Sequence, residues 1–329
     1  MPESRFSLFA VEVVRAYISK RKADSGTLKD ATASLSVAFI TGIFNNLIML
    51  PIMFIFMGSI AMVTPLQLGD RINELFGGQL SGWAILVSFA ICIPLADFLY
   101  YWPHRSAHRV EVIWGSHSVH HSSEHFNPTT ATRISFLDQA WDLVLMSAIC
   151  LLGFNPIYAL VSYALVLLHQ LPLHQMWTGR LPAWYEFFFN TPMHHRAHHA
   201  YQRMYIDKNF GGITIIWDRI FGTFVEVDDS LQPEFGLTQK VDTYNPFKIM
   251  TAEFVHMGSS TTIGFDTGAI LRPWTRFPGQ TSYTQGAARI LVDAQGGFTW
   301  ERRAGKTIYI SIRSEDATVV SNRLILRTN

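Results

Sequence analysis

The sequence predicts an all-α integral membrane protein with about four transmembrane helices. We expect a histidine-rich helical cap on the cytoplasmic side and a small C-terminal appendage, in which residue alternation favours β-structure. Three observations carry this prediction: long runs without charge, histidine clusters at the ends of these runs, and a charged fraction of 16% where soluble domains have roughly 25%. We divide the chain into a cytoplasmic leader (1–34), a membrane domain (35–250) and a cytoplasmic appendage (251–329).

The first two predicted spans are single apolar runs. Residues 35–63 contain no charged side chain and exceed the ~20 residues needed to cross a bilayer. An asparagine pair and Pro51 inside this run predict a tilted or kinked helix, which membrane spans tolerate. Residues 82–102 form the second span, with an aromatic end typical of the membrane interface and Asp97 as its one charge.

The third apolar region, 139–173, is divided by the sequence Gly-Phe-Asn-Pro at 153–156. Each half has about 17 residues, so the region is either a short hairpin of two spans or a re-entrant pair. Counting two spans here gives four membrane segments.

Charge distribution predicts the orientation of these segments. The leader carries six basic residues, whereas the connector between the first two spans has only Arg71. The positive-inside rule therefore places the N-terminus in the cytoplasm. The polar leader of some thirty residues excludes a cleavable signal peptide. Threading four segments from there returns every histidine cluster to the cytoplasmic side.

Histidines are grouped in three short boxes, HRSAH (104–108), HSVHH (117–121) and HRAHH (195–199). Positions i, i+3 and i+4 share one face of a helix, so each box presents its imidazoles to one side. Eight imidazoles exceed the four ligands of a tetrahedral zinc site and suffice to surround two metal ions. The spacing suits zinc, copper, iron or nickel alike. The predicted ligands in the boxes are His104, His108, His117, His120, His121, His195, His198 and His199.

Further residues are placed around these ligands. His174, at the end of the fourth apolar run, is predicted as a ninth ligand, with a packing role as the alternative. Asp97 lies two helical turns before His104, and we predict that it accepts the N–H of a ligating imidazole. Its alternative is a carboxylate lifted to the membrane interface. Supporting or packing positions are assigned to Glu124, His169 and His194.

Composition excludes several functional classes. A net charge of +1 gives no indication of a nucleic-acid partner. Cys92 and Cys150 both lie in apolar runs, which predicts two buried thiols and neither a disulfide framework nor a cysteine-based zinc site. Carboxylate di-iron bundles need a Glu-x-x-His motif on each of two helices, and the sequence has no such pair of motifs, since this spacing occurs only once, at 253–256.

With their flanks, the boxes resemble the fatty acid hydroxylase and sterol desaturase superfamily of non-haem di-iron membrane enzymes. The stretches that carry the resemblance, over about 80–250, are DFLYYWPHRSAH, SVHHSSEHFNPTTATR, NTPMHHRAHH and IDKNFGGITIIWDRIFGTF, and they are most similar to its alkylglycerol monooxygenase branch. The resemblance implies two iron ions held by the nine histidines, molecular oxygen and a lipid substrate in the bilayer.

An external electron donor is also implied, either a reductase chain or a pterin, because the sequence has no flavin, haem or iron–sulfur motif. Hydroxylation of a fatty acyl, sterol or ether-lipid C–H bond is the expected reaction. Desaturation on the same scaffold and ether-bond oxidation stay open. From another class, a membrane metal transporter or sensor is the alternative, although transporters usually place ionisable ligands at mid-membrane. Arginines 105, 109, 133 and 196 flank the boxes, as contacts for a lipid head or as membrane-surface anchors.

Beyond about residue 250 the resemblance fades. The chain becomes rich in Gly, Thr and Arg and then alternates with period two, as in KTIYISIRS and ATVVSNRLILRTN, with a Gly-Gly turn at 296–297. This alternation predicts a hairpin or a small sheet without a catalytic cluster.

Overall fold

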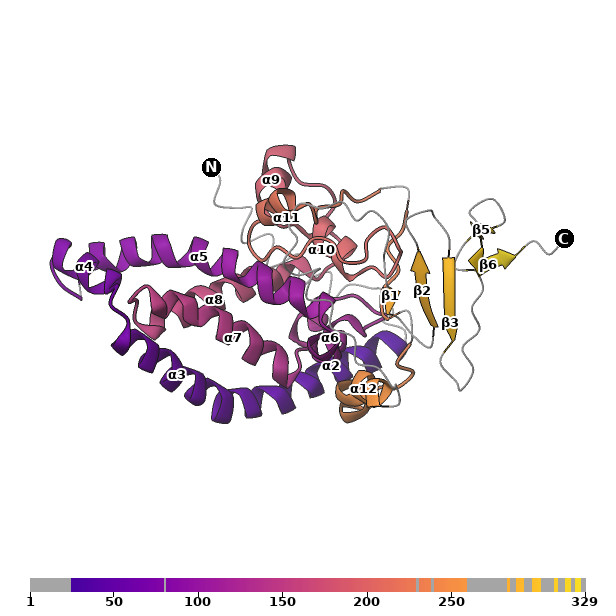
Figure 1. Cartoon of the computed structure of the whole chain (residues 1–329), viewed down its shortest axis with the longest axis horizontal. Coiled ribbons are helices and arrows are strands. Elements are labelled where there is room, and N and C mark those ends of the chain that lie inside the picture. Colours follow the sequence, from indigo (N-terminus) through magenta and orange to yellow (C-terminus); the bar gives the residue numbers. More distant parts are fainter. Residues whose placement is uncertain are drawn as a thin grey trace.

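The computed structural model describes residues 25–79, 81–228, 231–237 and 240–258, together with six short strands between residues 283 and 326. The protein is predominantly helical (Figure 1), as predicted. Residues 1–24 of the expected leader and the stretch 259–268 lie outside the described residues.

The N-terminal helix is longer than the span predicted for it. It runs without a break from Gly26 to Val63 and forms the long curved rod at the lower edge of Figure 1. It consists of α2 (Ser25–Phe44), a π-helical segment (Asn45–Met49) and α3 (Leu50–Val63). The π-segment ends two residues before Pro51, whose ring nitrogen has no N–H to donate to the helical hydrogen-bond ladder. This irregularity is the one that the asparagine pair and the proline predict.

Three helices are long and apolar enough to cross a membrane among the residues described: Gly26–Val63, Gly82–Arg109 and Pro156–Leu173. Large apolar side chains on their outer surfaces are exposed, as expected of a surface that lipid covers. In the first helix, for example, Phe39 is 70% exposed and Ile55 is 69% exposed. The third predicted span corresponds to α7 (Phe136–Leu151), which has only 16 residues. The prediction of helices that are long and apolar enough to cross a membrane is therefore confirmed, whereas the number of spans stays a prediction.

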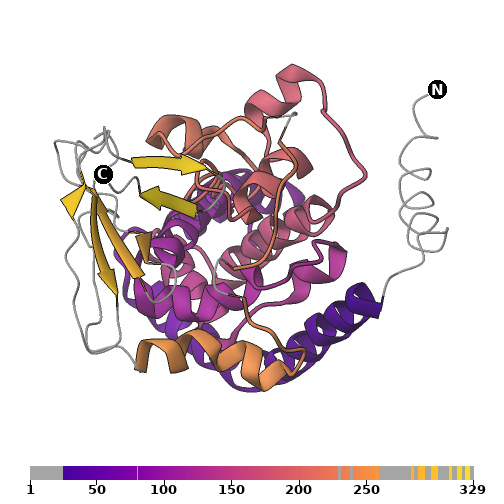
Figure 2. The same cartoon turned by 90° about the vertical axis from the view of Figure 1, so that its right-hand side faces the viewer.

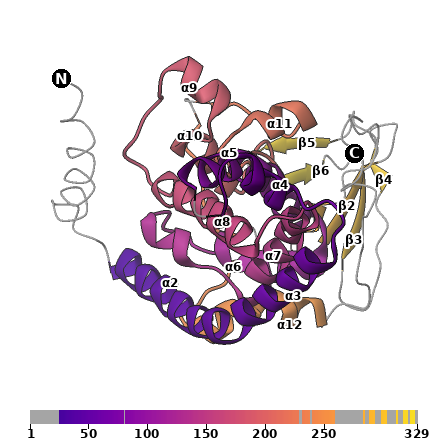
Figure 3. The same cartoon turned by 90° about the vertical axis from the view of Figure 1, so that its left-hand side faces the viewer.

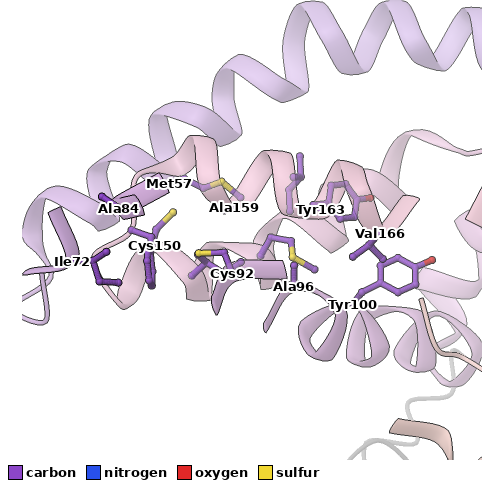
Figure 4. Close-up of a cluster of buried hydrophobic side chains, with 14 residues drawn as sticks. Met57, Ile72, Ala84, Cys92, Ala96, Tyr100, Cys150, Ala159, Tyr163 and Val166 are labelled. Carbon is purple, nitrogen blue, oxygen red and sulfur yellow. The ribbon is translucent and has the colours of Figure 1, made fainter. Parts of the chain in front are cut away.

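The spans enclose a buried core to which α5 contributes mainly small side chains. Helices α5 (Gly82–Arg109), α7 and α8 (Pro156–Gln170) pack against one another, and α3 packs on α7 and α8 (Figure 3). Small residues repeat every fourth position on α5 and are at most 1% exposed, which lets neighbouring backbones approach closely. They are Ala84, Ser88, Cys92 and Ala96. Both cysteines are buried in this core (Figure 4), as predicted.

At one end of the bundle a short turn connects the spans. Helix α4 (Leu68–Leu75) follows the first span, and Thr64 donates its hydroxyl hydrogen to the Leu151 carbonyl at 2.5 Å. Gly153 has φ +86°, and a Cβ atom there would lie 2.5 Å from the Gln67 Cα atom. Only glycine fits this close crossing of two chain segments.

Short helices gather at the opposite end, beyond the end of α5 (Figures 1 and 2). One buried ion pair attaches them to the first span: Arg133 donates to Asp30 at 2.8 Å, and both side chains are at most 6% exposed. Helix α12 packs against both α2 and α6. The helices of this cap are α6 (Glu111–His121), η2 (Pro128–Thr132), η3 (Leu171–Leu173), α9 (Ala183–Phe188), α10 (Pro192–His199), α11 (Ile216–Phe221) and α12 (Pro246–Gly258).

The described strands lie in the part of the chain where the residues alternate with period two. Strands β1 to β4 form an antiparallel sheet in sequence order, and β5 pairs with β6. The expected Gly-Gly turn at 296–297, between β2 and β3, lies outside the described residues. The strands are β1 (Tyr283–Thr284), β2 (Ala288–Val292), β3 (Phe298–Arg302), β4 (Ser311–Ile312), β5 (Ala317–Val320) and β6 (Arg323–Leu326).

Candidate metal centre

The structure brings the nine histidines predicted as ligands into two adjacent groups. They come from the end of α5, from α6, from the residue after η3 and from α10. Eight of the nine are buried, and His108 is half-buried. The five-histidine cluster contains His104, His108, His117, His121 and His198. The four-histidine cluster contains His120, His174, His195 and His199.

In the four-histidine cluster the Nε2 atoms converge on one point. The Nε2 atom of His174 lies 2.9 Å from that of His195 and 3.2 Å from that of His120. The Nε2 atoms of His195 and His199 are also 3.2 Å apart. A metal bound at about 2.0–2.1 Å from each nitrogen sets neighbouring ligand nitrogens about 3–3.4 Å apart, so this arrangement fits one ion.

In the five-histidine cluster three of the Nε2 atoms are buried without a hydrogen-bond partner in the described part of the chain. These belong to His104, His108 and His198, and the Nε2 atoms of His117 and His121 are 3.2 Å apart. Buried polar nitrogens without a partner are costly unless something binds them. A cation bound by their lone pairs satisfies all five at once, so the residues fit a second metal ion.

The two clusters share a boundary. The rings of His121 and His199, one from each cluster, stack with centroids 4.3 Å apart, and those of His198 and His195, again one from each cluster, are 5.4 Å apart. Two ions held by these groups would therefore be neighbours, as in two-metal enzyme sites.

Burial keeps these imidazoles neutral. It lowers the pKa of His174 to about 4 and that of His198 to about 3. Burial is also the largest cause of the lowered pKa of His120, His195 and His199, and neighbouring imidazoles lower each further. Neutral imidazoles are the form that binds metal, so the histidines of both clusters can bind cations at neutral pH without first losing a proton.

Backbone carbonyls fix which ring nitrogen is free to bind. The Nδ1–H groups of His104, His198 and His174 donate to the carbonyls of Phe210, Lys208 and Gln170 at 2.8, 2.8 and 2.9 Å. A carbonyl only accepts, so Nδ1 must carry the proton and Nε2 must keep its lone pair. Such outer partners are typical of metal-bound histidine.

Two carboxylates that the sequence analysis did not single out lie behind further ligands. The Asp207 carboxylate is 3.8 Å from the Nδ1 atom of His108, and that of Asp138 is 3.6 Å from the Nδ1 atom of His117. Asp207 belongs to the flank IDKNFGG, so the motif contained a signal for it. Asp138 precedes an apolar run and has no comparable signal.

One segment, Asp207–Thr214, supplies most of the outer partners of the five-histidine cluster, and we call it the carbonyl loop. Asp207 and Asn209 have φ +59° and +58°, a left-handed conformation that Asp and Asn adopt more readily than most residues. A Cβ atom on Gly211 would lie 2.1 Å from the Thr214 carbonyl oxygen, so glycine is required there. The chain folds back tightly at this point and directs successive carbonyls at the imidazoles.

Asp97 holds this loop and does not bind an imidazole, contrary to our prediction. Its oxygens accept hydrogen bonds from the backbone N–H of Ile213 at 2.6 Å, the Thr214 hydroxyl at 2.7 Å and the Trp217 indole at 2.9 Å. Helical spacing places Asp97 on the same face of α5 as His104, but two turns away. At that position its carboxylate is bonded to the returning loop and not to an imidazole. The carboxylate is 2% exposed, so it is not lifted to the membrane interface.

Asp218 holds the same loop from α11. It accepts the backbone N–H groups of Phe210 at 2.8 Å and Gly211 at 2.7 Å, and the Thr223 hydroxyl at 2.6 Å. Burial raises the pKa of Asp218 to about 6, so at neutral pH the carboxylate is ionised and its donors stabilise it.

The other supporting residues lie outside both clusters. The Glu124 carboxylate is 40% exposed and pairs with Lys240 at 2.7 Å. The Nε2 atom of His169 faces the Asn190 carbonyl at 3.3 Å. His194 is fully buried, and a ring nitrogen of it lies within 4.8 Å of carboxylate oxygens of Glu186 and Glu226. Of these, only His194 is close to other metal-binding side chains, and Arg180 already pairs with both of its acidic neighbours.

The four flanking arginines are bonded within the protein. Arg133 pairs with Asp30, and Arg109 approaches Asp207 at 3.3 Å. Arg105 donates to the Tyr101 hydroxyl at 2.9 Å, and Arg196 donates to the Gln175 carbonyl at 2.8 Å. None of the four lines the cavity beside the histidines.

That cavity has a volume of about 380 Å³ and lies between α5, α6, α7, α8 and η2. Two histidines of each cluster line it: His104 and His117 from one, His120 and His174 from the other. Most of its wall is apolar, and it includes Leu168 and Leu171, which are 59% and 42% exposed on the outer surface of the span.

Comparison with known proteins agrees with this geometry. Residues 89–223 match the fatty acid hydroxylase family model, and this range contains both histidine clusters. Human alkylglycerol monooxygenase is 35% identical over 256 residues, covering 78% of this chain and 53% of that protein. The Xenopus tropicalis alkylglycerol monooxygenase is 41% identical over 155 residues, covering 46% of this chain and 33% of that protein.

A bacterial relative is more distant. The ornithine lipid hydroxylase OlsE of Rhizobium tropici is 29% identical over 165 residues, which is 48% of each chain. The chain thus spans about half or less of the length of these relatives. No solved structure matches the chain.

Proposed function

Because residues 89–223 match the fatty acid hydroxylase family model, we propose that the chain belongs to this family and is an O₂-dependent di-iron monooxygenase that hydroxylates a membrane lipid. The observation that carries the proposal is the pair of adjacent imidazole clusters, both of which contribute to the wall of one largely apolar cavity. Imidazole suits iron among other metals, and the family supports iron.

Each cluster would hold one iron through its Nε2 atoms. Bound iron would supply the activation of dioxygen and the oxidation of an unactivated C–H bond. The protein's own part is to fix the ligands, through the carbonyl loop and the Gln170 carbonyl, and to hold the substrate in the cavity. The apolar wall excludes water from the reacting carbon.

A lipid is the substrate that fits this site. The cavity lies at the end of the spans, and its wall reaches the lipid-facing surface at Leu168 and Leu171. A substrate can therefore enter from the bilayer with its tail still in hydrocarbon. The names of the relatives, alkylglycerol monooxygenase and ornithine lipid hydroxylase, also support a lipid.

The enzyme would receive its electrons from an external reductase or a pterin. Following the positive-inside rule, we place the N-terminus, the histidine clusters and residues 251–329 in the cytoplasm, where such donors are found. The domain division at 34 and 250 belongs to the same proposal.

Labelled oxygen tests the reaction. Membranes that contain the protein are supplied with ¹⁸O₂ and a reductant, and lipid masses are compared with those of the His198→Ala variant. We expect one ¹⁸O atom in a lipid of the wild-type sample alone. A product two hydrogens lighter and without label would indicate a desaturase. Label in both samples or in neither would refute hydroxylation at this site, and tightly bound zinc without iron would refute the di-iron assignment.

A further inference from the structure

Helix α9 of the cap reverses the usual arrangement of a surface helix, because its polar side is buried and its apolar side is exposed. Trp184, Phe187 and Phe188 have the spacing i, i+3 and i+4, so they share one face of the helix. These three side chains are between 46% and 65% exposed. Glu186 points to the other side, where it is buried and accepts the backbone N–H of Leu181 at 2.9 Å. Surface helices of soluble domains bury their apolar stripe, so this exposed face indicates a contact with an apolar partner.

The segment that leads to α9 extends this exposed face. Residues 171–189 contain only two side chains of the types Asp, Glu, Lys and Arg, namely Arg180 and Glu186. These two side chains pair with each other at 3.4 Å, so the segment carries no net charge. We call its exposed large apolar side chains the aromatic surface, which consists of Met176, Trp177, Trp184, Phe187 and Phe188.

Hydrogen bonds fix α9 at the depth where two of the spans end. The carbonyl of its last residue accepts the backbone N–H of Ile215 at 3.0 Å. Two residues earlier, Ile213 donates its N–H to Asp97, which lies inside the span formed by α5. In the last turn of α8, His169 faces the Asn190 carbonyl at 3.3 Å. Figure 1 accordingly shows α9 level with the last part of α5 along the long axis of the molecule, and not beyond its end.

The aromatic surface also continues the lipid-facing surface of a span. Leu165, Leu168 and Leu171 are exposed on successive turns up to the end of the span Pro156–Leu173, and Met176 follows three residues later. Aromatic side chains, Trp above all, are enriched where the hydrocarbon core of a bilayer meets water. At this depth a water-soluble partner would have to reach the rings through the lipid head groups. Lipid is therefore the apolar partner that the position of α9 favours.

We propose that the aromatic surface lies in the membrane interface and contacts the acyl chains of the leaflet on the side of the cap. Short helices bind the interface in this way, with their apolar face at the boundary between head groups and acyl chains. The contact holds the cap against the bilayer beside Leu168 and Leu171, where the cavity wall reaches the lipid-facing surface. It goes beyond the proposed function, because it does not depend on which reaction the metal centre performs.

Fluorescent labels on single cysteines test the proposal. The full chain is reconstituted in phosphatidylcholine nanodiscs with the NBD fluorophore at Trp184→Cys or Phe187→Cys. Emission is quenched either from the bilayer, by a phosphatidylcholine with a doxyl group near the head-group end of its acyl chain, or from water, by iodide. We expect the doxyl lipid to remove most of the emission at both positions and iodide to remove little. Gln232→Cys, at an exposed position of the cap, is the control and should show the reverse. Cys92 and Cys150 are buried, so the wild type should take up no label.

A charged side chain on the aromatic surface should remove α9 from the lipid. Phe187→Glu is compared with the matched variant Phe187→Leu, each with the label at Trp184→Cys. The glutamate should shift quenching from the doxyl lipid to iodide, because a carboxylate among acyl chains is costly. The leucine should leave the quenching unchanged. Unchanged iron content shows that each variant is folded.

The proposal is overturned if iodide quenches residues 184 and 187 as strongly as residue 232, or if Phe187→Glu leaves the quenching unchanged. Protection from both quenchers would also overturn it and would indicate a protein partner, and disulfide-linked dimers of unlabelled Trp184→Cys would identify that partner as a second copy of the chain. These outcomes are independent of the ¹⁸O₂ experiment. Oxygen incorporation with an iodide-accessible α9 would contradict the interfacial contact alone, whereas quenching by the doxyl lipid without oxygen incorporation would contradict the proposed function alone.

Discussion

Replacing Asp218 by Asn should release iron from the five-histidine cluster and leave the four-histidine cluster loaded. Asp218 contacts no imidazole, but it accepts the backbone N–H groups of Phe210 and Gly211. The Phe210 carbonyl in turn accepts the Nδ1–H of His104. The four-histidine cluster receives its carbonyl from Gln170, outside this loop. The perturbation therefore acts on one cluster through two hydrogen bonds.

The size of the effect follows from the atoms involved. An asparagine oxygen can take over the role of Oδ1 towards Phe210 and Thr223, but its amide then points N–H groups at the N–H of Gly211. One hydrogen bond to a charged group is lost and one buried donor is left unpaired, which costs about 1.5–3 kcal/mol. This corresponds to a roughly 10- to 100-fold weaker retention of metal, the range found for outer partners of metal ligands.

Iron content is measured by mass spectrometry after equilibration with increasing concentrations of a chelator. Compared with the wild type, Asp218→Asn should lose one iron at about 10- to 100-fold less chelator and release the other at an unchanged chelator concentration. Asp242→Asn, an exposed site, is the matched control. A chelator curve identical to that of the wild type, or parallel loss of both irons, would refute the assignment of the carbonyl loop to one cluster.

Three further predictions concern topology and stability. A reporter inserted in the loop 121–137 should report the cytoplasm and one at residue 70 the far side; a far-side signal for the loop would contradict the orientation. Asp30→Ala should destabilise the protein by about 3–5 kcal/mol because it leaves the buried Arg133 without its partner, and thermal unfolding should show that the double variant with Arg133→Met is less affected. Gly153→Ala should lower the unfolding temperature, since a Cβ atom does not fit at that crossing, and an unchanged temperature would show that the turn adapts.

The sequence was most informative where the pattern is local. Spacings of three and four residues place histidines on one face of a helix whatever the tertiary structure, so the eight histidines of the boxes could be named in advance. His174 has no such spacing and is predicted from its place at the end of an apolar run and from the family resemblance. Their division into groups of five and four depends on how α5, α6 and α10 cross, which no local pattern encodes. His120 and His121 are adjacent in sequence and belong to different clusters.

The outer partners were harder to predict because they come from distant segments. Asp97 stood out as a lone charge in a span, but its partners are 116 to 120 residues away on a returning loop. Asp207 lies in a motif flank and Asp138 has no sequence signal, and neither could be assigned to its histidine before the loop and α7 were seen to pack against the cluster. The number of spans could not be predicted from apolar runs alone either, because α7 is apolar but shorter than the length needed to cross a bilayer.

The two histidine clusters are held in place by different structural elements, which suggests that they respond differently when a substrate fills the cavity. Both clusters contribute two histidines to its wall, so a substrate carbon faces the boundary between them. The five-histidine cluster is held by a loop with two left-handed residues and two buried carboxylates, an arrangement that permits little movement. The four-histidine cluster includes His174, which follows a short 3₁₀ turn at the end of a span and lies next to the cavity wall. We therefore expect the position of the second metal, and not that of the first, to respond when a lipid fills the cavity.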